Sequence, residues 1–353
     1  MAKIPMKAWQ SFALCIVILL ATIPGRAATI FEYVTPTPDS SPGDLAFDAA
    51  GNLWFTEING NKIGKLTPGE AEPGTVKGIT EYDLPQPGSK PQYILVARDG
   101  SIWFSEWGVN KIGRLDPKTG NIKEYPIPTA NSEPHNLAED DAGNIWFLEF
   151  ESNKVARLTP ASGEIKEFPV NEGNPHDLVL TGGQVWYTQG GKFWKGQYAN
   201  KIGRLDIASG KVEELIVPPE TSVPHGMTRA ADGSIWFTQF KGKKLARLDF
   251  AKGNPPSVVE YPLGRKSKTP HDLAVDDKRG RVWFVDNHAD AVGRLELAKS
   301  KPNTAYGVET FKIPTRGAHP HAIALDAEGN VWFTEMGMYF RGRFQNKIGK
   351  LTP

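Results

Sequence analysis

Histidines and acidic residues recur in this sequence in one fixed arrangement. The stretch from Pro320 to Glu335 reads P-H-A-I-A-L-D-A-E-G-N-V-W-F-T-E, with a Pro-His pair at its start and a glutamate at its end. Gly and Asn tolerate the positive φ of a tight turn, so the stretch predicts two antiparallel strands joined around Glu328. A symmetric hairpin places His321 across from Glu335, with Cβ atoms roughly 5 Å apart. We therefore expect an imidazole and a carboxylate to share one small space.

The same two positions can be followed through seven versions of this stretch. The position after the leading proline, or its equivalent, is occupied in chain order by Gly43, Gln92, His135, His176, His225, His271 and His321. The position expected to face it is occupied by Glu57, Glu106, Glu149, Gln189, Gln239, Asp286 and Glu335. Imidazoles and carboxylates without thiolates suit magnesium, calcium or manganese, and a neutral imidazole beside a cation is a plausible general base. The alternative is structural, because such pairs also satisfy buried polar groups.

Seven equivalent tryptophans define the elements that must position these residues. Their separations are 49, 43, 40, 50, 47 and 49 residues, and they are Trp54, Trp103, Trp146, Trp186, Trp236, Trp283 and Trp332. Repeats of this length with strand and turn signals are typical of a β-propeller with one four-stranded blade per repeat. No segment after the N-terminal region shows a sustained 3.6-residue apolar period, so almost no helix is expected. The sequence predicts an all-β, seven-bladed propeller over residues 29–353.

The two ends of the chain predict how the ring closes. The last repeat ends after N-K-I-G-K-L-T-P and supplies only three strands. The segment from Thr29 to Pro36 resembles the sequence of the fourth strand in the other repeats. We expect it to complete the last blade, which removes the exposed strand edges that an open ring leaves.

Residues 1–28 have the features of a secretory signal peptide. Two lysines precede an apolar run from Phe12 to Ile23, and small residues follow at Ala27 and Ala28. Cleavage there removes Cys15, the only cysteine, and changes the formal net charge from +1 to −2 by removing three cations. The predicted product is periplasmic or secreted, has no membrane span and no basic run for nucleic acid, and is expected to be a monomer. An uncleaved anchor is the alternative.

Two repeats carry an insertion after the second strand. The first runs from Gly190 to Lys201 and the second from Met336 to Lys347, and both are aromatic, basic and punctuated by glycine. Each begins beside the position of Glu335 or its counterpart, so both are expected at the end of the ring that holds the histidines. Loops on rigid scaffolds often line binding sites. The substrate-contacting residues predicted from them are Trp194, Tyr339 and Arg341.

The repeats P-H-x-[LI], D-x-x-G-x-[IVL]-W-F-T-E and N-K-I-G-R-L resemble those of the virginiamycin B lyase, or streptogramin B lyase, family over essentially all of residues 29–353. The resemblance implies a seven-bladed propeller and a magnesium-dependent elimination that opens a cyclic depsipeptide at its ester bond, an activity associated with antibiotic resistance. It also implies that His321 is the base, that Glu335 helps to hold the metal, and that His271 contacts substrate. The predicted export signal argues against an internalised antibiotic as the target.

One position departs from the family pattern. The family carries a second metal-associated glutamate two residues before the base, where this chain has His319. Imidazole ligates metals but suits magnesium less well than a carboxylate does. The third repeat offers an alternative site with the full triplet, namely Glu133, His135 and Glu149.

Three functions therefore remain open from the sequence. The first is an exported, metal-assisted carbon–oxygen lyase acting on a cyclic ester or cyclic peptide, with Glu335 and His319 holding a divalent metal, expected to be magnesium. The second is a metal-dependent hydrolase resembling lactonase-type propellers. The third is a propeller that binds a ligand without chemistry.

Overall fold

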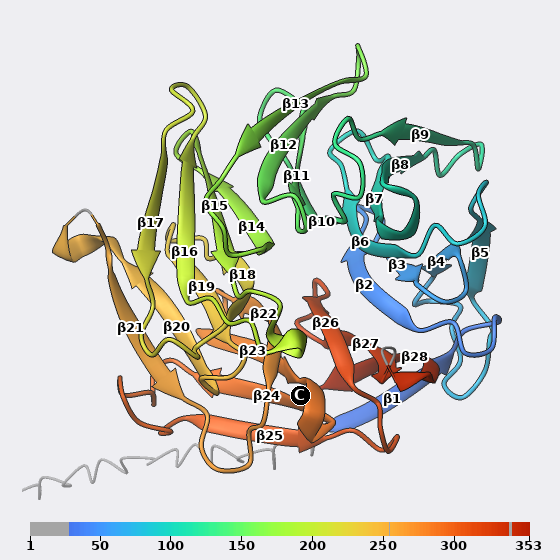
Figure 1. Cartoon of the computed structure of the whole chain (residues 1–353). Helices are drawn as coiled ribbons and strands as arrows, with labels where there is room; N and C mark the ends of the chain where they lie inside the picture. The colour runs from blue at the N-terminus through green and yellow to red at the C-terminus, as the bar shows by residue number, and fades with distance from the viewer. Residues whose placement is uncertain (1–27, 254, 339–340) are drawn as a thin grey trace, which may run out of the picture.

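Seven four-stranded antiparallel sheets form the protein and are arranged as a ring in the computed structural model (Figure 1). The structure describes residues 28–253, 255–338 and 341–353. No α-helix occurs in these residues, and the helical elements with described bounds are four short 3-10 helices. They are η1 (Trp107–Val109), η2 (Phe193–Lys195), η3 (Phe250–Lys252) and η4 (Asn287–Ala289). The prediction of an all-β seven-bladed propeller is confirmed.

The blades follow one another along the chain, and in each of the first six the strand order in the sheet equals the order in sequence. Blade one contains β2 (Pro42–Phe47), β3 (Leu53–Glu57), β4 (Lys62–Leu66) and β5 (Ile79–Asp83). Blade two contains β6 (Pro91–Val96), β7 (Ile102–Glu106), β8 (Lys111–Leu115) and β9 (Ile122–Pro126). Blade three contains β10 (Pro134–Glu139), β11 (Ile145–Glu149), β12 (Lys154–Thr159) and β13 (Glu164–Pro169).

The second half of the ring repeats this order. Blade four contains β14 (Pro175–Thr181), β15 (Gln184–Gln189), β16 (Lys201–Asp206) and β17 (Val212–Ile216). Blade five contains β18 (Pro224–Arg229), β19 (Ile235–Gln239), β20 (Lys244–Asp249) and β21 (Ser257–Pro262). Blade six contains β22 (Pro270–Asp276), β23 (Arg281–Asp286), β24 (Ala291–Glu296) and β25 (Val308–Lys312).

Blade seven is built from both ends of the chain. Its strands are β26 (Pro320–Leu325), β27 (Val331–Met338), β28 (Arg343–Thr352) and β1 (Thr29–Val34). β1 pairs antiparallel with β28, from Thr29 opposite Thr352 to Val34 opposite Lys347, and lies beside it in Figure 1. The predicted closure by the N-terminal strand is therefore confirmed. The second insertion is partly a strand extension, because Met338 pairs with Arg343 beyond a register shift.

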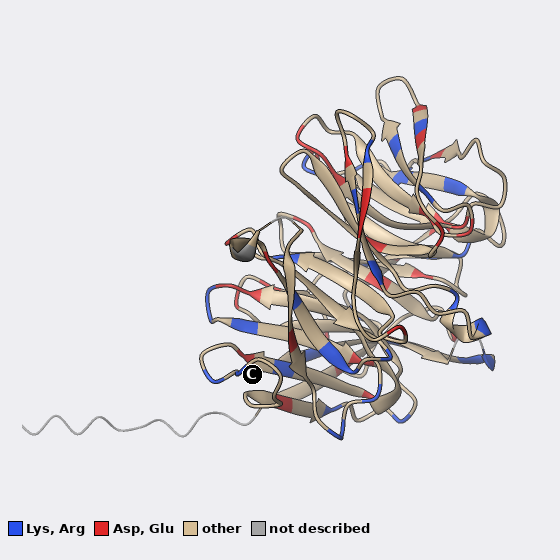
Figure 2. Ribbon diagram, turned by 60° about the vertical axis from the view of Figure 1, so that its left-hand side comes forward, with Lys and Arg blue, Asp and Glu red and all other residues tan. Residues whose placement is uncertain are grey.

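The core lies between the blades rather than within any one of them. Seven clusters of buried apolar side chains each combine residues from two neighbouring blades. The repeated tryptophan is buried in every blade, and a Lys or Arg of the third strand lies over its ring, as Arg114 does over Trp103. This cation–π contact accounts for the basic residue just before the final leucine of the N-K-I-G-R-L repeat. Figure 2 shows basic and acidic residues interspersed over the outer strands and loops.

Each blade has a β-bulge between its first two strands. The pairing shifts register between the opening proline and the residue three positions later, in all seven blades. In blade seven, Pro320 pairs with Glu335 and Ile323 pairs with Phe333, so two residues oppose one. A bulge of this kind re-aims the side chains of the extra residues. The predicted pairing of His321 with Glu335 is wrong, because the partner of Glu335 is Pro320.

The acids that end the second strands are buried beneath the loops between blades. Burial, followed by the neighbouring Glu81, raises the pKa of Glu57 to about 9, and burial with Glu124 raises that of Glu106 to about 8. Two blades carry Gln189 and Gln239 at this position, and both side chains are fully buried there as well. A neutral group therefore suits this position.

We expect the free energy of unfolding to fall as the pH rises from 7 to 9. The folded-state pKa values of Glu57 and Glu106 lie above the ordinary value of 4.5, so their stabilising contribution is complete below about pH 4.5 and is lost as the pH rises through 8 to 9. The E57Q/E106Q variant mimics blades four and five and should show a shallower decline. Urea unfolding at pH 7, 8 and 9 measures both slopes, and equal slopes would contradict the assignment.

Candidate functional site

Five imidazoles lie in a row at the end of the ring where the first strands begin, here called the mouth. The bulge residues His135, His176, His225, His271 and His321 are only 2–8% exposed. Successive ring centroids are 5.7, 4.6, 4.1 and 4.1 Å apart along this row. The predicted convergence of the histidines is therefore present.

Hydrogen bonds to the next blade fix the tautomer of two of these rings. His271 Nδ1 lies 2.9 Å from the carbonyl oxygen of His321, and His321 Nδ1 lies 3.1 Å from that of Gly43. A carbonyl oxygen only accepts, so Nδ1 carries the proton in both rings and Nε2 keeps a free lone pair. Burial lowers the pKa of His321 to about 4 and that of His271 well below its ordinary value. Both rings are neutral bases at neutral pH.

Two cavities open between these imidazoles and the insertions. The first, here called the blade-seven cavity, has a volume of about 220 Å³. Its lining residues are Phe193, Trp194, Phe240, His271, Asn287, His288, His319, His321, Met336, Gly337, Met338 and Arg341. The second, the blade-three cavity, has a volume of about 270 Å³. Its lining residues are Gln92, Tyr93, Trp107, Glu133, His135, Glu151, His176, Phe193, Trp194, Lys195, His225, His271 and His321.

Most of the residues predicted to form a site in blade seven line the blade-seven cavity. His321, His271, His319 and Arg341 line it, and Trp194 lines both cavities while stacking on Phe150 at 5.4 Å between ring centroids. Tyr339 lies outside the described residues.

Glu335 does not join these residues. Its carboxyl group is fully buried, and burial, then the nearby Glu32, raises its pKa to about 8, while Lys347 opposes that shift. The charged groups that act on His319 are instead His288, Asp290 and Arg341. The groups that act on Glu335 are Glu32, Lys347 and Thr315, so the two predicted metal ligands have different neighbours.

The alternative site is divided in the same way. Glu133 and His135 line the blade-three cavity, whereas Glu149 is buried behind the strand and accepts a hydrogen bond from Ser152 Oγ at 2.6 Å. The acid that reaches this cavity with Glu133 is Glu151, which the sequence prediction missed. Within the described residues, no group of three or more His, Cys, Asp or Glu side chains is placed to hold a metal ion.

The missed residues have a common signal in the sequence. Four lining residues each follow directly after a buried acid or amide of the second strand, namely Trp107, Phe240, Asn287 and Met336. Side chains alternate between the faces of an extended chain, so the residue after a buried acid turns towards the opposite side. His288 follows one position later, within η4.

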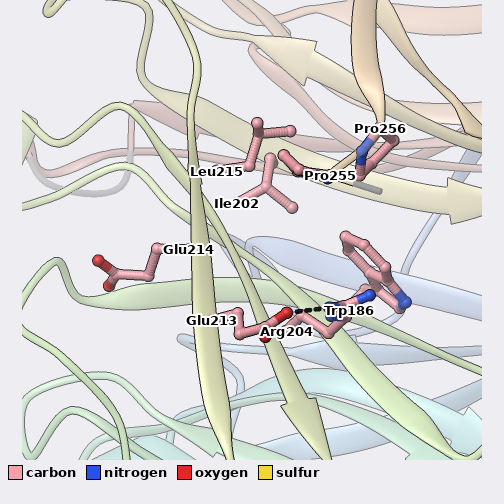
Figure 3. Close-up of a pocket in the computed structure, with 8 residues that line it drawn as sticks. All are labelled: Trp186, Ile202, Arg204, Glu213, Glu214, Leu215, Pro255 and Pro256. Carbon is pink, nitrogen blue, oxygen red and sulfur yellow. Dashed lines mark hydrogen bonds and ion pairs between the residues drawn. The ribbon is translucent and has the colours of Figure 1, made fainter. Parts of the chain in front are cut away.

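A cavity of about 410 Å³ lies away from the mouth, against the outer strands of blade four (Figure 3). Its lining residues are Trp186, Ile202, Arg204, Glu213, Glu214, Leu215, Pro255 and Pro256. Arg204 pairs with Glu213 inside it, and Glu214 pairs with Lys201 at 2.9 Å. With its charges already paired and no imidazole in its lining, this cavity is not the candidate site.

Comparisons with known proteins show the family of the chain. The family model of the virginiamycin B lyase family matches residues 22–197 and 194–353. The chain belongs to the virginiamycin B lyase family. A streptogramin B lyase structure is 30% identical with a TM-score of 0.77, covering 92% of this chain and 97% of that one.

Two further relatives bear on the site. A catalytically inactive His-to-Ala variant of virginiamycin B lyase from Staphylococcus aureus, solved with quinupristin, is 28% identical with a TM-score of 0.76 and covers 92% of this chain and 99% of that one. The virginiamycin B lyase of Nocardia farcinica is 28% identical over 167 residues, which are 47% of this chain. The match to this curated relative spans 49% of the relative's length. Among the described residues, no helix is long and apolar enough to cross a membrane.

We expect the rings of His271 and His321 to stay neutral, as Nδ1–H tautomers, at pH 5.5. Burial disfavours the charged imidazole, and the carbonyl acceptors hold the proton on Nδ1. Long-range ¹H–¹⁵N spectra identify the tautomer, and the H271A and H321A variants assign the signals. A titration midpoint near 6.5 in the folded protein, or an Nε2–H pattern, would contradict this description.

Proposed function

We propose that the protein is a carbon–oxygen lyase that opens a cyclic ester or depsipeptide by elimination, with His321 as the general base. The observation that carries the proposal is the bond from His321 Nδ1 to the Gly43 carbonyl oxygen, which leaves Nε2 unprotonated on a ring that lines the mouth cavities. Membership of the lyase family and the quinupristin complex of the Staphylococcus aureus relative support the reaction class.

The proposed elimination breaks one carbon–hydrogen and one carbon–oxygen bond and forms one carbon–carbon double bond. Nε2 of His321 takes a proton from the carbon next to the one that bears the ester oxygen. The electrons of that C–H bond form a carbon–carbon double bond, the carbon–oxygen bond breaks, and its electron pair leaves on a carboxylate. A positioned base contributes about 10²–10⁴-fold to a step of this kind. His271, beside His321, is proposed to contact the substrate, and Trp194 and Arg341 to line its binding site.

Magnesium is the metal expected from the sequence. Glu335 and His319 are not brought together, and carboxylate oxygens, which magnesium prefers, are absent from the described lining of the blade-seven cavity. These residues do not fit magnesium as a pair, so no step of the proposed reaction depends on it. Metal dependence stays a prediction.

Export to the periplasm or medium, and a monomeric state, are also part of the proposal. Export rests on the signal-like sequence of residues 1–28, nearly all of which lies outside the described residues. Sequencing the N-terminus of the protein recovered outside the cytoplasm tests the cleavage after Ala27 or Ala28.

We expect H321A to lower turnover of a depsipeptide such as quinupristin by about 10²–10⁴-fold while the fold stays intact, because the base is lost. H135A is the matched control, since His135 occupies the same bulge position but lines only the blade-three cavity. A larger loss in H135A than in H321A would move the base to blade three.

The product mass decides between the proposed lyase and the alternative hydrolase. Elimination leaves the mass of the opened ring unchanged, whereas hydrolysis adds one water. Mass spectrometry of the wild-type reaction separates them, and binding without any turnover would favour a ligand-binding propeller.

We expect magnesium to bind the H319E variant at least about ten-fold more tightly than the wild type, because the substitution adds a carboxylate to a cavity whose described lining has none. Calorimetric titration with magnesium chloride measures both affinities. Turnover before and after chelation tests metal dependence in the same preparations. Equal magnesium affinities would show that the cation does not enter this cavity.

A further inference from the structure

The blade-seven cavity is unusual in the charge of its lining. Its described lining residues include the guanidinium group of Arg341 and the imidazoles His271, His288, His319 and His321, but no aspartate or glutamate. Arg341 is the cation of this lining, His288 and His319 can donate hydrogen bonds, and His271 and His321 have an unprotonated Nε2. Such a lining favours an anion.

The two nearest acids, Asp286 and Asp290, act on His288 and His319 respectively, but neither carboxylate lines the cavity. Asp286 accepts hydrogen bonds from the backbone N–H groups of Lys268 and Thr269, each at 2.9 Å. Asp290 accepts them from the backbone N–H groups of Gly317 and His319, each at 3.1 Å. These bonds hold both carboxylates at the base of the loops, and neither carboxylate lines the cavity.

Within the part of the chain that the structure describes, Arg341 and Lys241 make no ion pair, and Lys268 donates to the His288 carbonyl oxygen at 3.2 Å. Arg341 is exposed, and Lys241 lies over the ring of Phe240, with its Nζ 5.9 Å from the ring centroid. Burial lowers the pKa of His288, and the nearby cations Lys241, Arg341 and Lys268 lower it further. Asp286 opposes this shift. Of these three cations, Arg341 lines the cavity.

The positions of His288 and His319 are fixed by the fold. His288 Nδ1 is 2.7 Å from Thr269 Oγ1, and the ring centroids of His288 and His319 are 4.6 Å apart in an edge-to-face arrangement. His319 has a φ of 45°, a left-handed conformation that is strained in a residue with a side chain. Preorganised donors of this kind bind an anion without having to reorganise.

Apolar side chains form the remaining part of the lining. Phe193 and Phe240 lie 4.7 Å apart between ring centroids, and Met336 and Met338 lie along the blade-seven strand. A cavity of about 150 Å³ accepts a benzene molecule, so a volume of 220 Å³ has room for a ring and a carboxylate together.

We propose that the blade-seven cavity binds the carboxylate of an aromatic or bulky apolar acid, with Arg341, His288 and His319 as its hydrogen-bond donors. The carboxylate has two possible sources, the acid released by ester elimination or an acidic group already present on the substrate. The inference rests on the proposed function for its role in turnover, but not for binding.

Calorimetry with the full mature chain tests the binding directly, with 3-phenylpropanoate and its uncharged amide as probes. We expect the acid to bind at least about ten-fold more tightly than the amide. We expect R341Q to weaken binding of the acid by about 10–100-fold, the size of a lost hydrogen bond to a charged group. R343Q is the matched control, because Arg343 is an exposed residue of the same hairpin that does not line the cavity. Equal affinities for acid and amide, no binding of the acid, or equal effects of R341Q and R343Q would each overturn the proposal.

Turnover distinguishes the two sources of the carboxylate. If the released acid occupies the cavity, R341Q relieves product inhibition with a neutral ester substrate. If the substrate's own acid occupies it, R341Q raises KM only for esters that carry a free carboxylate. Preferential binding of the acid without any turnover would support the cavity assignment and reject the lyase.

Discussion

The β-bulge at the start of every blade is the constraint on which the rest of this site depends. It sets two residues of the first strand against one residue of the second, between Pro320 and Ile323 in blade seven and at the equivalent place in the other six. Backbone groups at the bulge are then hydrogen-bonded by a threonine of the second strand. Thr334 Oγ1 accepts from the Ala322 N–H at 3.0 Å and donates to the Gly43 carbonyl oxygen at 2.9 Å. The same bulge therefore joins adjacent blades and aims a histidine at the mouth.

Burial at the centre of the ring determines the charge states of the site. Imidazoles and carboxylates are crowded there with little water, and desolvation favours the neutral form of both. Below the histidines, Asp44, Asp177 and Asp272 line a narrow channel, and burial raises the pKa of Asp44 and Asp272 to about 7. Each of these two aspartates accepts backbone N–H groups from its own blade and from the next, as Asp44 does from Leu45 and Ile94. Neutral imidazoles above and bound carboxylates below leave His321 as a base rather than an acid.

The fold was predictable from the sequence because its signals are repeated and local. Seven tryptophans at similar spacing specify seven blades. The segment that begins at Thr29 has the sequence of a fourth strand and specifies how the ring closes. The facing partner of His321 was not predictable, since a bulge has no distinctive residue in these repeats. A slip of one residue moves a side chain to the other face of the strand, and it separated Glu335 from the mouth. Side chains alternate along the second strand, so the position after the buried acid or amide would have indicated Phe240 and Met336 as lining residues.

The contrast between the two cavities gives the mouth a polarity that suits elimination. The blade-three cavity carries the acids Glu133 and Glu151 beside Lys195, whereas the described lining of the blade-seven cavity is cationic and apolar. His271 and His321 line both. An elimination needs a base at the carbon that loses a proton and a positive field at the oxygen that leaves with the electrons. A substrate that crosses this boundary with its ester oxygen towards Arg341 meets both requirements at once, while the reverse orientation places the developing carboxylate beside two acids. For the proposed elimination, the electrostatics of the mouth would favour one orientation of the ester, and that orientation would be the productive one.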